Sequence, residues 1–209
     1  MIGVGRTPIR VAIVDDHPVV GAGTAALLRA QEDLTVIGVA ASIDAARASG
    51  LTSRDAVDVL LLDIRLGPDS GLGLLSTDPG LPATIVLTAY DYPQYAEAAL
   101  RLGAAGFVLK TAPLDELLEA IRRVAAGGLA FAARPASRGV RLTRREHDVV
   151  RLVVEGRSND EIGTALGIGA KTVETHLGRL FERVGVASRT ELATRALREG
   201  WLEVPPPGA

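Results

Sequence analysis

Four short apolar runs of this sequence each end on polar side chains. These side chains are Asp15 and Asp16 after the first run, Asp63 after the second, Thr88 after the third and Lys110 after the fourth. Short runs of branched apolar residues are typical of buried parallel strands. In an open parallel sheet, chemistry takes place outside the carboxyl ends of the strands. The sequence therefore predicts that three carboxylates, a hydroxyl and an ammonium meet at one edge of a sheet.

This collection of groups suits a divalent cation and a phosphoryl group. Mg²⁺ is usually held by one or two carboxylates together with water and phosphate oxygens. A carboxylate can attack phosphorus to form an acyl phosphate, whose oxygens then need a metal, a cation and hydrogen-bond donors around them. Asp63 follows the middle strand and is the candidate nucleophile, with Lys110 as the cation and Thr88 as the hydroxyl donor.

The elements that must position these groups alternate along the first 127 residues. Strands are predicted at about 9–14, 34–40, 57–63, 84–88 and 106–109. Helices are predicted at about 18–30, 43–49, 72–76, 93–102 and 113–126, where Pro18, Pro93 and Pro113 each occupy a plausible first helical position. This alternation indicates a parallel sheet with right-handed crossovers. The third helix must be short, because prolines and a glycine crowd the segment that follows it.

The pattern becomes purely helical from Leu142 onward. Two capping boxes, Thr143-x-x-Glu146 and Ser158-x-x-Glu161, open the first two helices. A third helix is predicted over 170–184, with an apolar inner face and polar or basic groups elsewhere. Two short helices joined by a glycine-containing turn are typical of a helix-turn-helix. On periodicity alone, however, a small bundle that binds protein or nothing would be favoured.

The bulk composition sets outer limits. With 209 residues the chain is either one large domain or two small ones, and the absence of cysteine excludes disulfides and thiolate metal sites. No apolar stretch approaches the ~20 residues that span a bilayer, and residues 1–10 lack a signal-peptide core, so a cytoplasmic protein with no membrane partner is expected. Residues 1–139 carry a net charge of −3 (12 − 15) and residues 140–209 carry +1 (11 − 10), so any case for DNA binding rests on motif.

Residues 8–127 resemble the CheY-like receiver domain of two-component response regulators. The resemblance is carried by Val14-Asp15-Asp16-His17, Asp63-Ile64-Arg65-Leu66, Leu87-Thr88-Ala89 and Gly103-Ala104-Ala105-Gly106-Phe107-Val108-Leu109-Lys110. It implies an α/β fold with a doubly wound, five-stranded parallel sheet in the order 2-1-3-4-5.

The same resemblance implies roles for individual residues. Asp63 would accept phosphate from a sensor histidine kinase, and Mg²⁺ would be bound by Asp15, Asp16, Asp63 and the backbone carbonyl of Arg65. Thr88 matches the switch hydroxyl and Phe107 the switch aromatic, so the face near Phe107 and Tyr90 is expected to repack on phosphorylation. Gly67, followed by Pro68, stands where the family usually has proline, which leaves the geometry of that loop and the lifetime of the phosphate open.

Residues 142–202 resemble the LuxR-type DNA-binding domain. The resemblance is carried by segments 142–146, 155–162, 166–168, 171–177 and 183–186. Together with the receiver it makes the chain resemble a NarL/FixJ-type response regulator from end to end. We therefore expect a receiver over 8–127, a linker over 128–139, an all-α helix-turn-helix domain over 140–204 and a disordered tail over 205–209.

By this resemblance, 170–184 is the recognition helix in the major groove of DNA. The expected phosphate contacts are Lys171, Thr172, His176, Arg179 and Arg183, although His176 could instead be a packed helix residue. Glu174, Thr175 and Gly178 lie where the family often reads base edges, and Gly178 offers no side chain there. The last helix, about 189–200, resembles the family's dimerisation helix, and Leu192 and Leu197 could form its apolar face or belong to the domain core.

The expected function is that of a transcriptional regulator, not an enzyme. Phosphorylated on Asp63 by a histidine kinase, it would bind a double-stranded promoter site as a homodimer. One alternative is a regulator of the same fold that is controlled by a ligand or partner without phosphorylation. A second is a Mg²⁺-dependent phosphatase, which would need an aspartate where Arg65 stands. A third is a helical output domain that binds protein.

Overall fold

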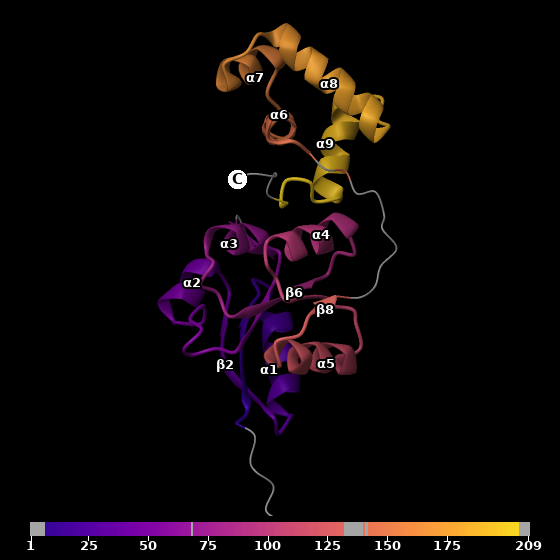
Figure 1. Ribbon diagram of the computed structural model, residues 1–209. Helices are drawn as coiled ribbons and strands as arrows, with labels where there is room; N and C mark the ends of the chain where they lie inside the picture. The colour runs from indigo at the N-terminus through magenta and orange to yellow at the C-terminus, as the bar shows by residue number, and fades with distance from the viewer. Residues whose placement is uncertain (1–6, 68, 132–139, 141, 205–209) are drawn as a thin grey trace, which may run out of the picture. The chain divides into compact units, whose positions relative to one another are not determined.

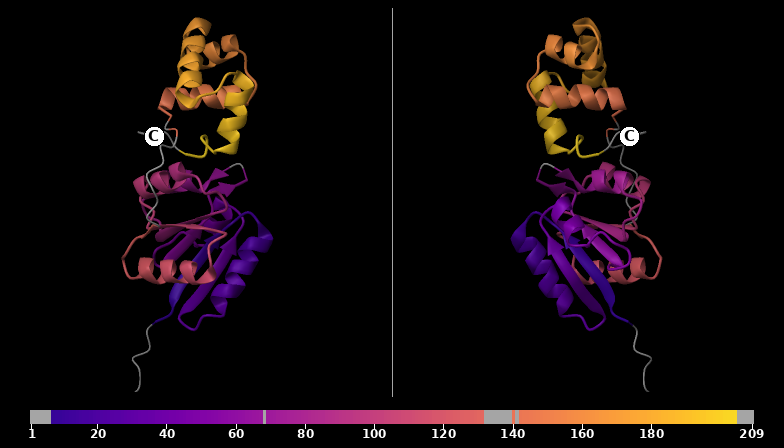
Figure 2. Two further views of the ribbon diagram at one scale, coloured as in Figure 1. Left: turned by 90° about the vertical axis from the view of Figure 1, so that its right-hand side faces the viewer. Right: turned by 90° about the vertical axis from the view of Figure 1, so that its left-hand side faces the viewer.

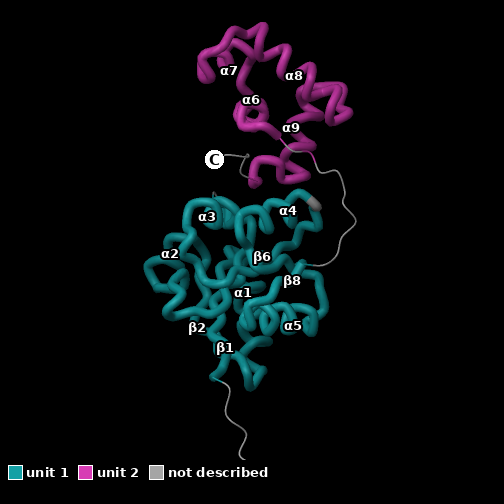
Figure 3. The backbone as a smooth tube through the Cα atoms, in the orientation of Figure 1, with its two compact units in different colours: residues 1–137 teal, residues 138–209 magenta. Residues whose placement is uncertain are grey.

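The computed structural model describes residues 7–67, 69–131, 140 and 142–204. The chain divides into two compact units, residues 1–137 (unit 1) and residues 138–209 (unit 2), as Figure 3 shows. Parts of the expected linker (132–139), the expected tail (205–209) and Pro68 lie outside the described residues. The domain boundaries expected from the sequence remain predictions.

Unit 1 is built on a parallel sheet of six strands (Figure 1). The strands are β1 (Ile9–Val14), β2 (Leu34–Ala40), β3 (Val59–Leu62), β6 (Ala83–Thr88), β7 (Gly106–Leu109) and β8 (Ala130–Phe131). Their order is β2-β1-β3-β6-β7-β8, and every pair is parallel. The order of the five predicted strands is therefore confirmed, and the doubly wound fold with it.

The sixth strand, β8, was not predicted. It lies in the segment that the sequence indicated as linker, so part of that segment belongs to the sheet. The N–H of Ala130 donates to the carbonyl of Ala105 at 2.8 Å, and Phe131 pairs with Phe107. These two residues pair with the open edge of β7 through backbone hydrogen bonds. A strand of two residues shows no alternation of apolar and polar side chains, so the sequence does not reveal it.

Five helices cover the two faces of this sheet (Figure 2). They are α1 (Pro18–Arg29), α2 (Ile43–Ala48), α3 (Gly71–Thr77), α4 (Pro93–Arg101) and α5 (Leu114–Ala125). Residues of α1 and α5 share one core cluster with alternate residues of the central strands, and α2, α3 and α4 lie over the opposite face. All four residues of β3 are buried, as expected for a strand covered on both faces. The third helix is short, as predicted, whereas Pro113 caps α5 instead of starting it.

A small hairpin separates β3 from α3. Its strands are β4 (Arg65–Leu66) and β5 (Asp69–Ser70), which pair antiparallel. Gly67 between them has φ +64°, a left-handed conformation that glycine adopts freely and that the ring of a proline excludes. The sequence predicted only a loop here, because two-residue strands carry no alternation to detect.

Gly71 sets where α3 begins. Its N–H donates to the carbonyl of Ile64 at 2.8 Å, and a Cβ placed on it would lie 2.1 Å from the backbone oxygen of Asp63. The first turn of α3 therefore packs directly against the backbone of the residue that follows the middle strand, β3.

Unit 2 consists of four helices in its described part. They are α6 (Arg144–Val154), α7 (Asn159–Leu166), α8 (Ala170–Val184) and α9 (Arg189–Arg198). Both predicted capping boxes are present, and Gly167 ends α7 with φ +65°. The bounds of α8 are those predicted, while α9 ends two residues earlier than expected. The inner faces of the helices form one core cluster that includes Trp201.

We predict that Gly71→Ala destabilises unit 1 by about 2–3 kcal/mol, because a methyl group cannot avoid a backbone oxygen by rotating. Gly73→Ala is the matched control. It lies on the same helix with its nearest neighbour 3.8 Å away, and we expect it to stabilise unit 1 by about 0.5–1 kcal/mol. Calorimetry of the full chain measures both effects, and equal melting of the two variants would contradict the close approach.

Candidate functional site

The carboxyl ends of four adjacent strands bring the predicted polar groups together. Asp15 and Asp16 follow β1, Asp63 follows β3, Thr88 ends β6 and Lys110 follows β7. Asp15, Asp63 and Thr88 are buried. The sequence placed these groups correctly because the parallel order of the strands carries all of their ends to one edge.

Lys110 ties the two buried carboxylates together. Its Nζ lies 2.7 Å from Oδ2 of Asp15 and 2.6 Å from Oδ2 of Asp63. Its backbone N–H also donates to the carbonyl of Thr88 at 2.8 Å, which keeps the start of the lysine side chain in line with the sheet. Bonds between charged groups at these distances are among the stronger hydrogen bonds in proteins.

The electrostatics of the site leave Asp63 short of positive charge. Burial raises the pKa of the Asp63 carboxyl above its usual range, in spite of the bond from Lys110. Burial alone would lower the pKa of the Lys110 ammonium, but its hydrogen bonds to Asp15 and Asp63 outweigh this and raise it. One ammonium thus compensates two carboxylates incompletely, and a further cation would stabilise the charged form of Asp63.

Four side chains of this region could hold a metal ion. One ligand atom each from Asp15, Asp16, His17 and Asp63 lies within 4.8 Å of the others. Three carboxylates form an oxygen-rich donor set of the kind that hard dications prefer. The raised pKa of Asp63 is a second sign that the set fits a cation.

His17 is the member of this cluster for which the sequence predicts no role. Its side chain is 64% exposed, and its Nδ1 lies 2.8 Å from Oδ1 of Asp16. Its backbone N–H donates to Oδ1 of Asp15 at 2.9 Å. The position next to two aspartates was the available signal, since neighbouring residues at a strand end share the same edge.

Asp16 also holds the hairpin beside the site. Its Oδ2 accepts the N–H of Gly67 at 2.9 Å. Arg65, whose carbonyl was expected among the metal ligands, begins this hairpin two residues after Asp63. The loop that departs from the usual sequence is therefore attached to a carboxylate of the site.

Of the expected switch residues, Thr88 ends β6, Tyr90 follows β6, and Phe107 lies on β7. Thr88 is 0% exposed, and its Oγ1 accepts the N–H of Tyr90 at 3.3 Å. Phe107 is 4% exposed and pairs with Val86 on one side and Phe131 on the other. Thr88 and Tyr90 are in contact, whereas Phe107 lies on the next strand.

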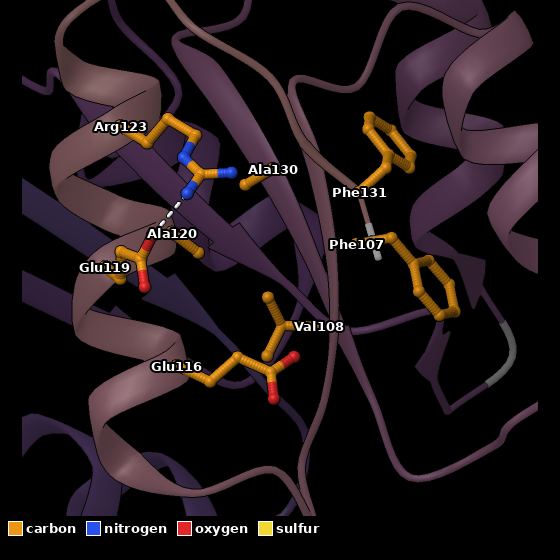
Figure 4. A pocket seen from close by; sticks show the side chains of 8 residues that line it. All are labelled: Phe107, Val108, Glu116, Glu119, Ala120, Arg123, Ala130 and Phe131. Atoms are coloured by element: carbon orange, nitrogen blue, oxygen red, sulfur yellow. Dashed lines mark hydrogen bonds and ion pairs between the residues drawn. The ribbon is translucent and has the colours of Figure 1, made fainter. Parts of the chain in front are cut away.

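A cavity of about 160 Å³ lies between α5 and the strands β7 and β8 (Figure 4). Phe107 and Phe131 line one side, and Glu116, Glu119 and Arg123 project from α5 on the other. Glu119 and Arg123 form an ion pair there. None of the carboxylate cluster lines this cavity, so it is separate from the site described above.

In unit 2, most of the predicted DNA contacts lie on the outer face of α8. The exposed ones are Lys171, Thr172, Glu174, Thr175, Arg179 and Arg183, and His176 is half-buried. Nζ of Lys171 bonds Oε2 of Glu174 at 2.8 Å. Gly178 has open space where a side chain would stand.

Arg183 makes a contact that the sequence did not reveal. It forms an ion pair at 2.8 Å with Glu146, the capping-box residue of α6. Burial would raise the pKa of Glu146, but its bonds with Thr143 and Arg183 outweigh this and lower it. The end of α8 is thereby fastened to the start of α6.

The two leucines of α9 have different environments. Leu192 is 0% exposed and belongs to the core of unit 2, whereas Leu197 is 55% exposed. Of the two alternatives that the sequence left open for Leu192, the structure shows that it belongs to the domain core.

None of the helices in the described part of the chain has the length and apolar character that a membrane crossing requires.

Residues 11–122 match the response regulator receiver domain, and residues 140–196 match the bacterial regulatory proteins of the luxR family. Transcriptional regulatory protein UhpA of Escherichia coli strain K12 is 41% identical over 198 residues, covering 92% of this chain and 100% of that protein. Oxygen regulatory protein NreC of Staphylococcus carnosus is 30% identical over 219 residues, covering 93% and 100%.

A solved structure matches as well. RcsB from Salmonella enterica serovar Typhimurium, bound to promoter rprA in the presence of the phosphomimetic BeF3⁻, has a TM-score of 0.58 and 25% identity. The match covers 90% of this chain and 98% of that chain.

The raised pKa of Asp63 predicts a pH dependence of stability. Between the ordinary carboxyl pKa and the raised one, the folded state binds more protons than the unfolded state, so stability falls as pH rises through that window. At pH 7 with a chelator present, we expect Asp63→Asn to raise the melting temperature of unit 1. The gain should shrink toward zero below pH ~4, where the carboxyl is protonated in both states.

Asp33→Asn is the control, for which we expect a change in stability of the opposite sign. The hydrogen bond from Arg122 lowers the pKa of Asp33, so removing this charge should slightly reduce stability at pH 7. Because this pair is half-exposed, the loss should stay below about 1 kcal/mol. A lower melting temperature for Asp63→Asn at pH 7 would refute the electrostatic account of the pocket.

Proposed function

The chain belongs to the response regulators of two-component systems, with a receiver domain and a LuxR-type DNA-binding domain, and we propose that phosphorylation of Asp63 controls it. Its family consists of DNA-binding transcriptional regulators, not enzymes. The observation that carries the proposal is the bridge from Lys110 to both Asp15 and Asp63 at one sheet edge.

The chemistry follows from the positions of these groups. An oxygen of the Asp63 carboxylate forms a bond to phosphorus while the bond from phosphorus to the donor histidine nitrogen breaks. The product is an acyl phosphate on Asp63 and a free imidazole on the kinase. The Lys110 ammonium, already 2.6 Å from Asp63, is within easy reach of the phosphoryl oxygens that arrive there.

Mg²⁺ is the cation that suits this pocket. Asp15, Asp16, Asp63 and the carbonyl of Arg65 would hold it, and the bound ion would neutralise phosphoryl oxygens during transfer. The buried, under-compensated Asp63 supports this assignment. The complete set of carboxylates, hydroxyl and ammonium favours phosphorylation over control by a ligand alone.

Thr88 would then act as the sensor of the phosphoryl group. A phosphate monoester carries about −1.5 to −2 charges at neutral pH, and the phosphoryl group on Asp63 would bring similarly charged oxygens into the pocket. The Thr88 hydroxyl is the buried donor at the end of the adjacent strand. Its movement toward the phosphoryl group would alter the packing of Tyr90 and Phe107. A receiver with two such arrangements can bias its partners between two states.

The output is binding of α8 in the major groove of a promoter. Lys171, Thr172, His176 and Arg179 would contact phosphates, and Glu174 and Thr175 would contact base edges. Arg183 would have to leave Glu146 to reach a phosphate. A homodimer formed on phosphorylation would present two such helices to a site of two-fold symmetry.

Intact mass spectrometry tests the phosphoacceptor. With acetyl phosphate and Mg²⁺, we expect the full chain to gain the mass of one phosphoryl group, and Asp63→Asn to gain none. Asp69→Asn is the control, because Asp69 is an exposed aspartate six residues further along and should leave the gain intact. An adduct that persists in Asp63→Asn would show that another residue is phosphorylated.

The salt dependence of DNA binding tests α8. Each phosphate contact contributes a slope of about −0.9 to the plot of log affinity against log salt concentration. We expect Arg179→Ala to weaken binding to genomic DNA fragments and to reduce this slope by about 1. Arg151→Ala on α6, equally a loss of one exposed arginine, should leave the slope unchanged. Equal slopes for both variants would show that Arg179 does not contact a DNA phosphate.

A further inference from the structure

All three tyrosines of the chain lie within six residues, and each ring contacts the ring of the next tyrosine in the sequence. The rings of Tyr90 and Tyr92 are stacked, with centroids 5.8 Å apart, and Tyr92 meets Tyr95 edge to face at 5.4 Å. We call these three residues the tyrosine column. In a chain with only 3% aromatic residues, such a cluster between β6 and α4 is a distinctive local feature.

One end of the tyrosine column is held by Arg65. The guanidinium carbon of Arg65 lies 4.0 Å from the centroid of the Tyr90 ring, and Nη1 donates to the Tyr90 hydroxyl at 2.8 Å. A guanidinium bound both to the face of a ring and to its hydroxyl is a cation–π contact with a fixed orientation. The two residues are 25 positions apart in the sequence, so this contact joins the hairpin of β4 and β5 to the segment between β6 and α4.

The loop that carries Arg65 belongs to the phosphorylation pocket. Arg65 is two residues after Asp63, and the tip of its hairpin bonds Asp16 through the N–H of Gly67. Any change in the cation or the phosphoryl group at Asp63 and Asp16 therefore acts on this hairpin through short, direct contacts.

Tyr90 is also bound to Thr88, the expected switch residue. Its N–H donates to Oγ1 of Thr88 at 3.3 Å. If the Thr88 hydroxyl turns toward a phosphoryl group, this bond weakens or pulls Tyr90 along. The backbone of Tyr90 thus follows Thr88, while its ring is bound to Arg65.

The other end of the tyrosine column is anchored in α4. Tyr92 immediately precedes this helix, and its carbonyl accepts the N–H of Tyr95 at 2.9 Å. Tyr95 is 0% exposed, so its ring cannot shift without its neighbours in the core. Because a packed core responds as a unit, a displacement of Tyr92 is passed to the first turn of α4.

We propose that Arg65 and Tyr90 form a clasp that transmits the state of the Asp63 pocket to α4 through the tyrosine column. Arg65 is a positioning residue in this scheme: its side chain acts on Tyr90 and its role is conformational. The inference rests on the proposed phosphorylation of Asp63 and adds a route to α4 that is distinct from Phe107 on β7.

The chain allows a direct test, because it contains only three tyrosines. Full-length protein grown with 3-fluorotyrosine should show three ¹⁹F resonances, which single Tyr→Phe variants assign. In the wild type, Mg²⁺ with acetyl phosphate should shift all three resonances. In phosphorylated Arg65→Ala the shifts at Tyr92 and Tyr95 should be lost, and Tyr90→Phe, which keeps the ring but not the hydroxyl, should lose part of them.

A second measurement needs no phosphoryl group. In resting protein, Arg65→Ala should displace the resonances of Tyr92 and Tyr95 as well as that of Tyr90. Arg47→Ala, which removes an exposed arginine of α2, is the matched control and should displace none. If resting Arg65→Ala moves the Tyr90 resonance alone, the tyrosine column does not transmit and the proposal is wrong.

The outcomes separate the clasp from the function on which it rests. Intact mass reports phosphorylation independently of the ¹⁹F spectrum. Phosphorylated Arg65→Ala with wild-type shifts at Tyr92 and Tyr95 would overturn the clasp while leaving the function standing. A wild type that takes up no phosphoryl group would overturn the proposed function, and the clasp as its transmitter would fall with it. If Arg65→Ala is not phosphorylated by acetyl phosphate, Mg²⁺ with the phosphomimetic BeF₃⁻ is used instead. The ¹⁹F shifts of Tyr92 and Tyr95 then test the clasp in the same way.

Discussion

The structure of the receiver depends on one ammonium group shared between two buried carboxylates. A buried charge is tolerated only when it is paired, and Lys110, which follows β7, pairs with Asp15 after β1 and Asp63 after β3 in the same sheet. Because β1, β3 and β7 must all end at one level to allow this, the fold and the site constrain each other. Because Asp63 is incompletely compensated, a further cation would stabilise its charged form.

Around this centre, the backbone after Asp63 is placed by close approaches that tolerate few residue types. Gly71 lets α3 start against the Asp63 carbonyl, and Gly67 supplies the left-handed turn of the hairpin. The hairpin holds Arg65 near Tyr90, and Thr88 holds Tyr90 from the other side. A pocket whose buried carboxylates share one ammonium thus borders a hairpin whose position depends on a few polar contacts. Such a combination suits a protein that registers a bound group and changes shape.

Unit 2 shows a comparable division between fixed and available groups. Glu146 closes the capping box of α6 and also binds Arg183, so it positions α8 as well as the helix it begins. The exposed face of α8 keeps Lys171 and Arg179 at its surface. The core contacts of Val173, Leu177 and Leu180 orient this face. One face of α8 therefore stabilises the domain, and the other is exposed.

By itself the sequence determined the strand ends at Asp15, Asp63, Thr88 and Lys110, both capping boxes and the bounds of α8. Each has a local signal, either a continuous apolar run that ends on a polar residue or a cap followed by helical periodicity. Only the tertiary structure decided the two-residue strand β8, the ion pair of Arg183 with Glu146, the burial of Leu192 and the contact of Arg65 with Tyr90. These features depend on segments that are distant in sequence and meet only when the chain is folded, so no local pattern records them.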